Sequence, residues 1–440
     1  MHDAVIAPGG EDLTVDVRNL TRVEGEGSLH LRVRGGAVES AQLEIFEAPR
    51  YFERLVVGRS MDEVIDIVAR ICGICPVAYQ MTAVHAAESA FDIEVDPATV
   101  ALRRLLYCGE WIESHALHIY LLHLPDLLGY PSALDLAQHE RPTVEGGLRL
   151  KRAGNAIVAR IGGRAIHPVS VRVGGFSRVI RRDEITSLRA DLAEAMDLAE
   201  ATVDLVGSLE PPAFRRDGRL VALRAPDTYP MNHGRIVSND GLDLAVSDWE
   251  SMFEERQVAW SHALQAHGRD GRPYLLGPSS RVTLDADQLH PRASAALTRI
   301  GLADAIAHEP NWSIAARAVE LVHAVAQAID IVDAYEPPAK GSVPWLPRAG
   351  TAAWATEAPR GLLFQRFGLD ADGRVMEARI VPPTSQNQAA IEADLALFAP
   401  TILDRPHEEI THLLEQLIRS YDPCISCATH FLDLKVEDLP

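Results

Sequence analysis

The chain has 440 residues and a mass of 48.1 kDa, which is enough to bury a large hydrophobic core. It carries 62 acidic residues against 42 Lys and Arg, and the net charge of −20 disfavours nucleic acid or an anionic membrane surface as the main partner. The first residues lack the regions of a secretory signal, and no apolar run approaches the roughly 18 residues of a transmembrane segment, so we expect a cytoplasmic protein.

In chain order, the first predicted element is a β-hairpin over residues 29–45. Apolar and polar residues alternate there around Gly35 and Gly36, a pair that suits a tight turn. Residues 98–124 are rich in leucine and have helical periodicity, and residues 183–209 predict a capped amphipathic helix. The N-terminal half is therefore expected to be mainly helical after one hairpin.

A further helix is predicted over residues 313–335, and a second hairpin over residues 361–383 with its turn at residues 370–373. A last helix over residues 407–421 is expected to stop before Pro423. The chain shows no internal repeat and no linker. We therefore predict an α+β fold, a predominantly α-helical single large unit with small antiparallel β-hairpins near the N- and C-terminal regions.

The two predicted hairpins place distant residues opposite each other at their open ends. Pairing about the first turn brings Glu24 opposite Glu47, and pairing about the second brings Arg360 opposite Pro382. Functional loops tend to lie at such ends of a rigid scaffold. Both ends are therefore candidate parts of a functional site.

Four of the five cysteines form two Cys-x-x-Cys pairs, Cys72 with Cys75 and Cys424 with Cys427. Four thiolates can hold a structural zinc, an iron–sulfur cluster, or a nickel or iron site, and unrelated core cysteines are a further alternative. The two pairs lie near opposite ends of the chain, whereas a structural zinc usually has its second pair much closer. A thioredoxin-like dithiol is disfavoured because neither pair follows a βαβ pattern. The fifth cysteine, Cys108, is expected to be a core thiol.

The residues around both pairs resemble the large, catalytic subunit of NiFe-hydrogenases. The thiol motifs are "RICGICPVAYQ" and "SYDPCISCATH", and the order of the other motifs is also that of the family: "TRVEGEG", "FERLVVGR", "ESHALHIY", "GGRAIHPVSVRVGGF", "EAPRG" and "VPPTSQNQ". The first thiol motif is most similar to that of the soluble, bidirectional, NAD(P)-linked class, also called sulfhydrogenases. The resemblance covers residues 1–440 as one domain.

The resemblance implies reversible heterolytic cleavage of H2 into protons and electrons. It implies nickel held by four thiolates, two of them shared with an iron that carries CO and two CN ligands. By position, Cys72 and Cys424 would be the terminal nickel ligands, and Cys75 and Cys427 the bridging ones. Soft thiolates suit such metals.

The resemblance also implies roles for residues around these metals. Glu24 would relay protons from Cys424, a task that requires a raised pKa such as burial provides. Arg360 would lie over the open coordination position and stabilise charge, and Asp422 would belong to a charged canopy around the site. A second canopy Asp of the family falls on Ser114, so the canopy is altered in this chain.

Two further sets of ligands follow from the resemblance. Pro382 belongs to the "VPP" segment facing Arg360, and either Thr384 or Pro383 would contact a cyanide, because "VPPTSQN" is one residue longer than the commonest family form. Glu53 and His430 match ligands of a buried magnesium, which is iron in some members.

Electrons must leave through other polypeptides, because the chain has no ligand set for a cluster and no dinucleotide-binding fingerprint. The resemblance implies a small subunit with iron–sulfur clusters and flavin-containing diaphorase subunits that use NAD(P). It also implies a maturation protease that removes residues 431–440 after nickel insertion. A hydrogen-sensing regulatory subunit with the same metal site and a structural zinc protein are the alternatives.

Overall fold

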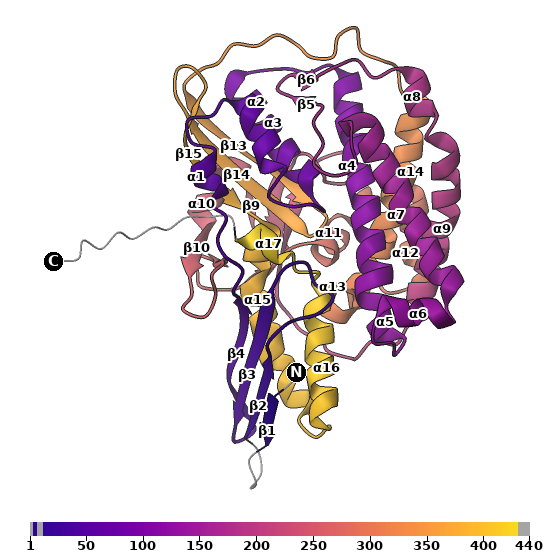
Figure 1. Ribbon diagram of the computed structural model, residues 1–440, viewed down its shortest axis with the longest axis vertical. Coiled ribbons are helices and arrows are strands. Elements are labelled where there is room, and N and C mark those ends of the chain that lie inside the picture. Colours follow the sequence, from indigo (N-terminus) through magenta and orange to yellow (C-terminus); the bar gives the residue numbers. More distant parts are fainter. Residues whose placement is uncertain (1–2, 7–11, 430–440) are drawn as a thin grey trace, which may run out of the picture.

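The computed structural model describes residues 3–6 and 12–429 (Figure 1). Its N-terminal sheet is antiparallel in the order β1 (Asp3–Ile6), β2 (Leu13–Val17), β3 (Gly27–Arg34) and β4 (Ala37–Ile45). The predicted first hairpin is confirmed as β3 and β4. Gly35 and Gly36 have φ values of 57° and 76°, a left-handed turn that glycine adopts without steric cost.

The predicted opposition of Glu24 and Glu47 is wrong in register. A bulge between Arg32 and Val33 shifts the pairing, and the paired strands begin only at Gly27, which lies opposite Ile45. Glu24 lies before β3 and forms an isolated parallel bridge with Cys424 instead.

A bundle of long helices forms the opposite side of the molecule, as Figure 1 shows. Its main members pack against one another and are α4 (Pro97–Leu117), α7 (Arg141–Gly162), α9 (Arg189–Gly207) and α14 (Ser313–Ala334). Two glycines allow α4 and α7 to approach closely: a Cβ on Gly154 would lie 2.5 Å from the Gly109 carbonyl oxygen. Asp96 caps α4 by accepting the Thr99 N–H at 2.9 Å.

The predicted helices are present with two interruptions. The predicted helix over residues 98–124 ends as α4 and continues as a π-helical segment (His118–His123) and α5 (Leu124–Leu127). The one over residues 183–209 divides into α8 (Arg182–Thr186) and α9. The last two predicted helices agree closely with α14 and α16 (His407–Ser420).

The second predicted hairpin is part of a three-stranded antiparallel sheet of β13 (Gly350–Ala358), β14 (Gly361–Leu369) and β15 (Val375–Val381). Ala358 pairs with Gly361, so Arg360 lies in the two-residue turn between β13 and β14. The predicted opposition of Arg360 and Pro382 is therefore wrong. Phe364 pairs with Val381, because a bulge near Gly368 shifts the register, and α15 (Pro383–Phe398) begins where a longer strand was expected.

The remaining elements connect the sheets and the bundle. The helices are α1 (Phe52–Leu55), α2 (Met61–Val68), α3 (Pro76–Phe91), α6 (Ala133–His139), α10 (Trp249–Met252), α11 (Pro278–Asp285), α12 (Pro291–Ile300), α13 (Ala303–His308) and α17 (Ile425–Ala428). The strands are β5 (Val171–Arg172), β6 (Gly175–Phe176), β7 (Arg219–Arg224), β8 (Arg235–Ser238), β9 (Asp243–Leu244), β10 (Phe253–Gln257), β11 (Leu264–Gly268) and β12 (Tyr274–Leu275). Among the described residues, no helix has the length and apolar character needed to cross a membrane.

Candidate metal centre

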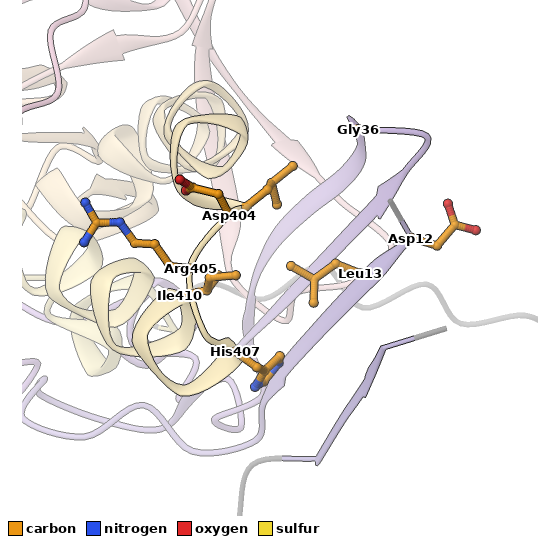
Figure 2. Close-up of a pocket in the computed structure, with 8 residues that line it drawn as sticks. Asp12, Leu13, Gly36, Asp404, Arg405, His407 and Ile410 are labelled. Atoms are coloured by element: carbon orange, nitrogen blue, oxygen red, sulfur yellow. The ribbon is translucent and has the colours of Figure 1, made fainter. Parts of the chain in front are cut away.

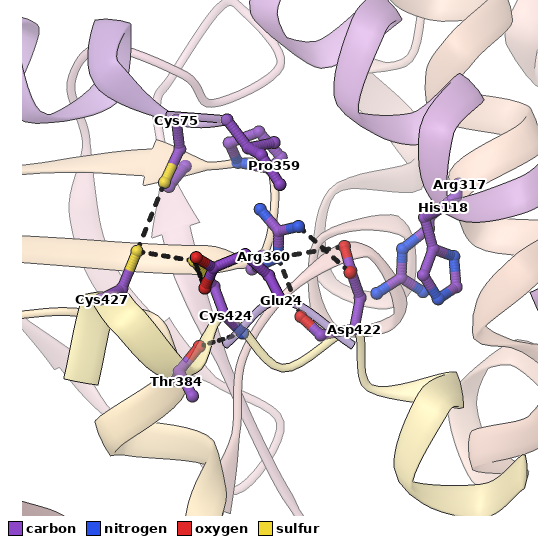
Figure 3. Close-up of polar contacts among 12 residues, drawn as sticks. Glu24, Cys75, His118, Arg317, Pro359, Arg360, Thr384, Asp422, Cys424 and Cys427 are labelled. Atoms are coloured by element: carbon purple, nitrogen blue, oxygen red, sulfur yellow. Dashed lines mark hydrogen bonds and ion pairs between the residues drawn. The ribbon is translucent and has the colours of Figure 1, made fainter. Parts of the chain in front are cut away.

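The structure brings the four paired cysteines together in the largest hydrophobic core. Figure 3 shows three of them, Cys75, Cys424 and Cys427. Their sulfurs all lie within 4.8 Å of one another. The Cys72 and Cys424 sulfurs are 3.5 Å apart, and the Cys75 and Cys427 sulfurs 3.6 Å apart. All four residues are at most 3% exposed. No other group of three or more metal-ligating side chains occurs in the part of the chain that the structure describes.

The second thiol loop is held by hydrogen bonds from distant segments. The Ile425 N–H donates to the Glu24 carbonyl at 2.9 Å, and the Cys424 N–H donates to the Thr384 hydroxyl oxygen at 3.0 Å. Cys424 is the N-cap residue of α17, as Cys75 is of α3. Each pair thus lies where a loop enters a helix.

The pKa values of the thiols are shifted in opposite directions. Burial opposes ionisation of Cys72, but hydrogen bonds from the other three thiols and the positive charge of Arg360 hold its pKa well below the usual range. Burial and the neighbouring thiols raise the pKa of Cys424 well above it. Four sulfurs this close cannot all ionise without a cation, which is the property of a metal site.

Glu24 is close enough to exchange a proton with a thiol. Its Oε2 atom is 3.1 Å from the Cys424 sulfur and accepts the Ser426 N–H at 3.0 Å. The side chain is half-buried. The geometry is therefore that of a direct sulfur-to-carboxylate hydrogen bond.

Arg360 lies between the thiols and Asp422 (Figure 3). Its Nε donates to the Asp422 carbonyl at 2.8 Å and its Nη2 to the Asp422 carboxylate at 3.1 Å. Burial lowers the pKa of Arg360, but Asp422 and the thiols outweigh it and raise that pKa well above the usual range. Its Nη1 is buried and has no hydrogen-bond partner within residues 12–429. The permanently charged guanidinium therefore has both N–H groups of Nη1 without a hydrogen-bond partner among these residues.

The turn that carries Arg360 is held in place by Arg281 and Gly277. Arg281 donates to the Ala358 and Pro359 carbonyls, each at 3.0 Å. Gly277 has a φ of 105°, and a Cβ there would lie 2.9 Å from the Arg360 carbonyl oxygen. The position of the Arg360 guanidinium is therefore fixed in two ways: its turn is held by Arg281 and Gly277, and its side chain by Asp422.

The structure places the two remaining predicted site residues of this region at the start of α15. Pro382 is its N-cap residue, and Thr384 is within its first turn and 2% exposed. Because the Thr384 oxygen accepts the Cys424 N–H, its hydroxyl hydrogen can donate elsewhere.

Glu53 lies near the three-stranded sheet, where its Oε1 accepts the Ile380 N–H of β15 at 2.7 Å. Sequence reasoning missed Glu255, whose carboxylate is 3.0 Å from the Arg379 guanidinium and whose side chain is 3% exposed. Burial raises the pKa of Glu255 to about 8, with Arg379 opposing the shift and Glu53 adding to it. Nothing in the strand sequence marked Glu255. His430, the other predicted ligand, lies outside the described residues.

Two more residues at the thiol loops were not recognised from the sequence. Arg50 donates to the Ile71 carbonyl at 2.7 Å and also to the Ser426 carbonyl, so it ties together the two loops that carry the thiol pairs. Glu110 of α4 accepts N–H groups from the first turn of α3. Glu110 is the only charged residue between Leu105 and Ile112, and this was the signal that could have found it.

The next two residues occupy the position at which the resemblance implies an altered canopy. Ser114 is buried, and the adjacent Glu113 is 7% exposed and forms an ion pair with Lys151. Burial raises the pKa of Glu113, and Lys151 opposes the rise. Cys108 is a buried core thiol as predicted, and burial raises its pKa to about 12.

A separate surface cavity of about 380 Å³ lies between the N-terminal sheet and the start of α16 (Figure 2). It is lined by Asp12, Leu13, Gly36, Leu403, Asp404, Arg405, His407 and Ile410. None of the predicted site residues is among them, so the candidate chemistry lies elsewhere.

Comparison with known proteins identifies the family. Residues 50–144 match the family model described as nickel-dependent hydrogenase. The chain is 33% identical to the alpha chain of sulfhydrogenase 1 from Pyrococcus furiosus, covering 96% of this chain and 99% of that protein. It is 32% identical to the alpha chain of sulfhydrogenase 2 from the same organism, covering 96% of this chain and 100% of that protein.

The fold agrees with these sequence matches. A chain of an NAD+-reducing NiFe-hydrogenase, solved in the H2-reduced state, superposes with a TM-score of 0.86 and 26% identity and covers 97% of this chain and 100% of that one. The predicted family, fold class and activity are thereby confirmed. The chain belongs to the nickel-dependent hydrogenases and is the catalytic large subunit of a NiFe-hydrogenase.

Proposed function

We propose that Cys72, Cys75, Cys424 and Cys427 hold nickel together with an iron that carries CO and two CN ligands. The observation that carries this proposal is the set of four buried sulfurs within 4.8 Å of one another in a nickel-dependent family. Cys72 and Cys424 would serve as the terminal nickel ligands, and Cys75 and Cys427 as the ligands shared with the iron. Such a centre, when bound, supplies the site at which H2 is polarised and its electrons are accepted.

Glu24 takes the proton of the reaction from the Cys424 sulfur. The 3.1 Å contact supports direct transfer, and the Ser426 N–H at 3.0 Å holds the receiving oxygen in place. From Glu24 the proton moves outward through the half-buried loop that carries this residue.

Arg360 stabilises negative charge at the open side of the centre. Asp422 fixes two of its nitrogens, which leaves Nη1 directed to other partners. Thr384, at the start of α15, has a hydroxyl hydrogen that can donate to a cyanide, and the neighbouring Pro382 and Pro383 shape the same wall. Arg360 and Thr384 would thus hold the diatomic ligands of the iron by hydrogen bonds, without binding the metal themselves.

A second metal site, for magnesium or iron, is formed by Glu53 and His430. The Glu53 carboxylate lies at the strand position next to Arg379, and the nearby Glu255 supplies further negative charge. A hard divalent cation prefers such oxygen ligands. A maturation protease would remove residues 431–440, which lie outside the described residues, as His430 does.

The electrons pass to a partner subunit with iron–sulfur clusters. Flavin-containing diaphorase subunits then use NAD(P), as the NAD+-reducing character of the superposed hydrogenase supports. We place the complex in the cytoplasm and residues 1–440 in one large-subunit domain.

Elemental and infrared analysis of the purified complex tests the metal centre. We expect about one nickel and one iron per catalytic chain at this centre, with infrared bands of CO and CN, and the loss of both metals and bands in Cys424→Ser. Zinc alone in active enzyme, or full activity of Cys424→Ser, would refute the assignment and favour a structural zinc.

A further inference from the structure

The side chain of Glu110, a residue of α4, lies at the N-terminus of α3, the helix that follows the first thiol pair. Its Oε2 accepts the Val77 N–H at 2.6 Å and its Oε1 the Ala78 N–H at 3.1 Å, and the residue is 1% exposed. Helix α3 begins at Pro76, which has no N–H, directly after Cys75. A carboxylate from α4 therefore takes up the first N–H donors of α3.

The two sulfurs of this pair have different surroundings. The Cys72 sulfur accepts the N–H groups of Ile74 at 3.3 Å and Cys75 at 3.2 Å. Over residues 12–429, the Cys75 sulfur receives no such backbone N–H, and its close polar contact is the Cys427 sulfur at 3.6 Å. The difference coincides with the donors that Glu110 has taken.

Helix N-termini normally bind anions, and a thiolate there is a common one. A sulfur that binds two metals needs its lone pairs for them, and an N–H hydrogen bond would compete. We propose that Glu110 is a positioning residue that fixes the first turn of α3 and keeps its N–H donors from the Cys75 sulfur, so that this sulfur can bridge nickel and iron. This inference rests on the proposed ligand set.

The test compares Glu110→Ala and Glu110→Gln with the unsubstituted complex by infrared spectroscopy and by the rate of nickel loss to a chelator. Freed N–H groups that turn toward Cys75 withdraw electron density from the centre, so the CO band should rise in frequency, more in the alanine than in the glutamine variant. Nickel loss should be about 10- to 100-fold faster, the usual effect of removing a residue that orients a ligand. A fold-stabilising role alone would not move the CO band.

Glu88→Gln is the matched control. Glu88 is also on α3, is 6% exposed, and accepts a backbone N–H, from Gly174 at 2.8 Å. We expect this variant to melt at a lower temperature with the CO band unmoved.

Normal nickel retention and an unshifted CO band in Glu110→Ala would overturn the inference while leaving the ligand set intact. If the alanine variant does not fold, an unshifted band in Glu110→Gln has the same meaning. Absence of nickel from the unsubstituted complex would instead overturn the ligand set and this inference together.

Discussion

Replacing Glu24 by glutamine should stop proton transfer while leaving the metal centre in place. In the unsubstituted protein the Ser426 N–H donates to Glu24 Oε2 at 3.0 Å. The amide oxygen of glutamine can still accept this hydrogen bond, so the loop should keep its position. The amide cannot accept the proton that the Cys424 sulfur offers across 3.1 Å. Loss of a positioned proton acceptor typically reduces the rate by about 10²–10⁴-fold, or about 3–5 kcal/mol in the barrier.

The assay is H2-dependent reduction of an artificial dye by the purified complex, with nickel content measured in parallel. Glu47→Gln is the matched control, because Glu47 is also a carboxylate that binds Ser426: it accepts a hydrogen bond from the Ser426 hydroxyl at 3.0 Å. We expect the Glu47 variant to retain most turnover. Equal turnover of Glu24→Gln and unsubstituted enzyme at equal nickel content would remove Glu24 from the proton path.

Three other predictions follow from single contacts. Arg360→Lys should lower H2 turnover at least about tenfold, because one ammonium cannot reproduce the guanidinium bonds to both the carbonyl and the carboxylate of Asp422. Unchanged turnover at normal nickel content would contradict this. Gly154→Ala should destabilise the chain by about 1–3 kcal/mol, because its Cβ would lie 2.5 Å from the Gly109 carbonyl oxygen; denaturant unfolding should show this, and Gly350→Ala, where no atom lies within 4 Å of the added Cβ, is the comparison without crowding. Arg281 and His115 outweigh burial and lower the pKa of Glu320 to about 2. That pKa is below the unfolded value of about 4.3. The ion pair therefore stabilises the fold fully at pH values above about 4.3, and this stabilisation is lost as the pH falls toward 2. Glu320→Gln should therefore cost about 3–5 kcal/mol at neutral pH and less near pH 3, as measured by unfolding at both values; a cost independent of pH would contradict the ion-pair explanation.

Local patterns predicted the elements that depend on near neighbours in sequence. The Gly35-Gly36 turn was recognisable because a hairpin of this kind needs left-handed backbone at its centre. Register was less predictable. A bulge near Arg32 shifted the register ahead of Glu24, and Arg360 lies in the turn between β13 and β14 instead of opposite Pro382. Both features depend on tertiary packing.

The sequence by itself determined the family of the protein, because two thiol pairs in the company of six ordered motifs leave little room for another family. It also supplied the residue types that the chemistry requires. Only the tertiary structure decided which groups meet. Glu24 reaches Cys424 across 400 positions of sequence, Arg360 reaches Asp422, and Glu110 reaches the helix that follows Cys75. Contacts of this kind arise from the packing of whole elements, and the residues between them carry no local pattern that records the distance in space.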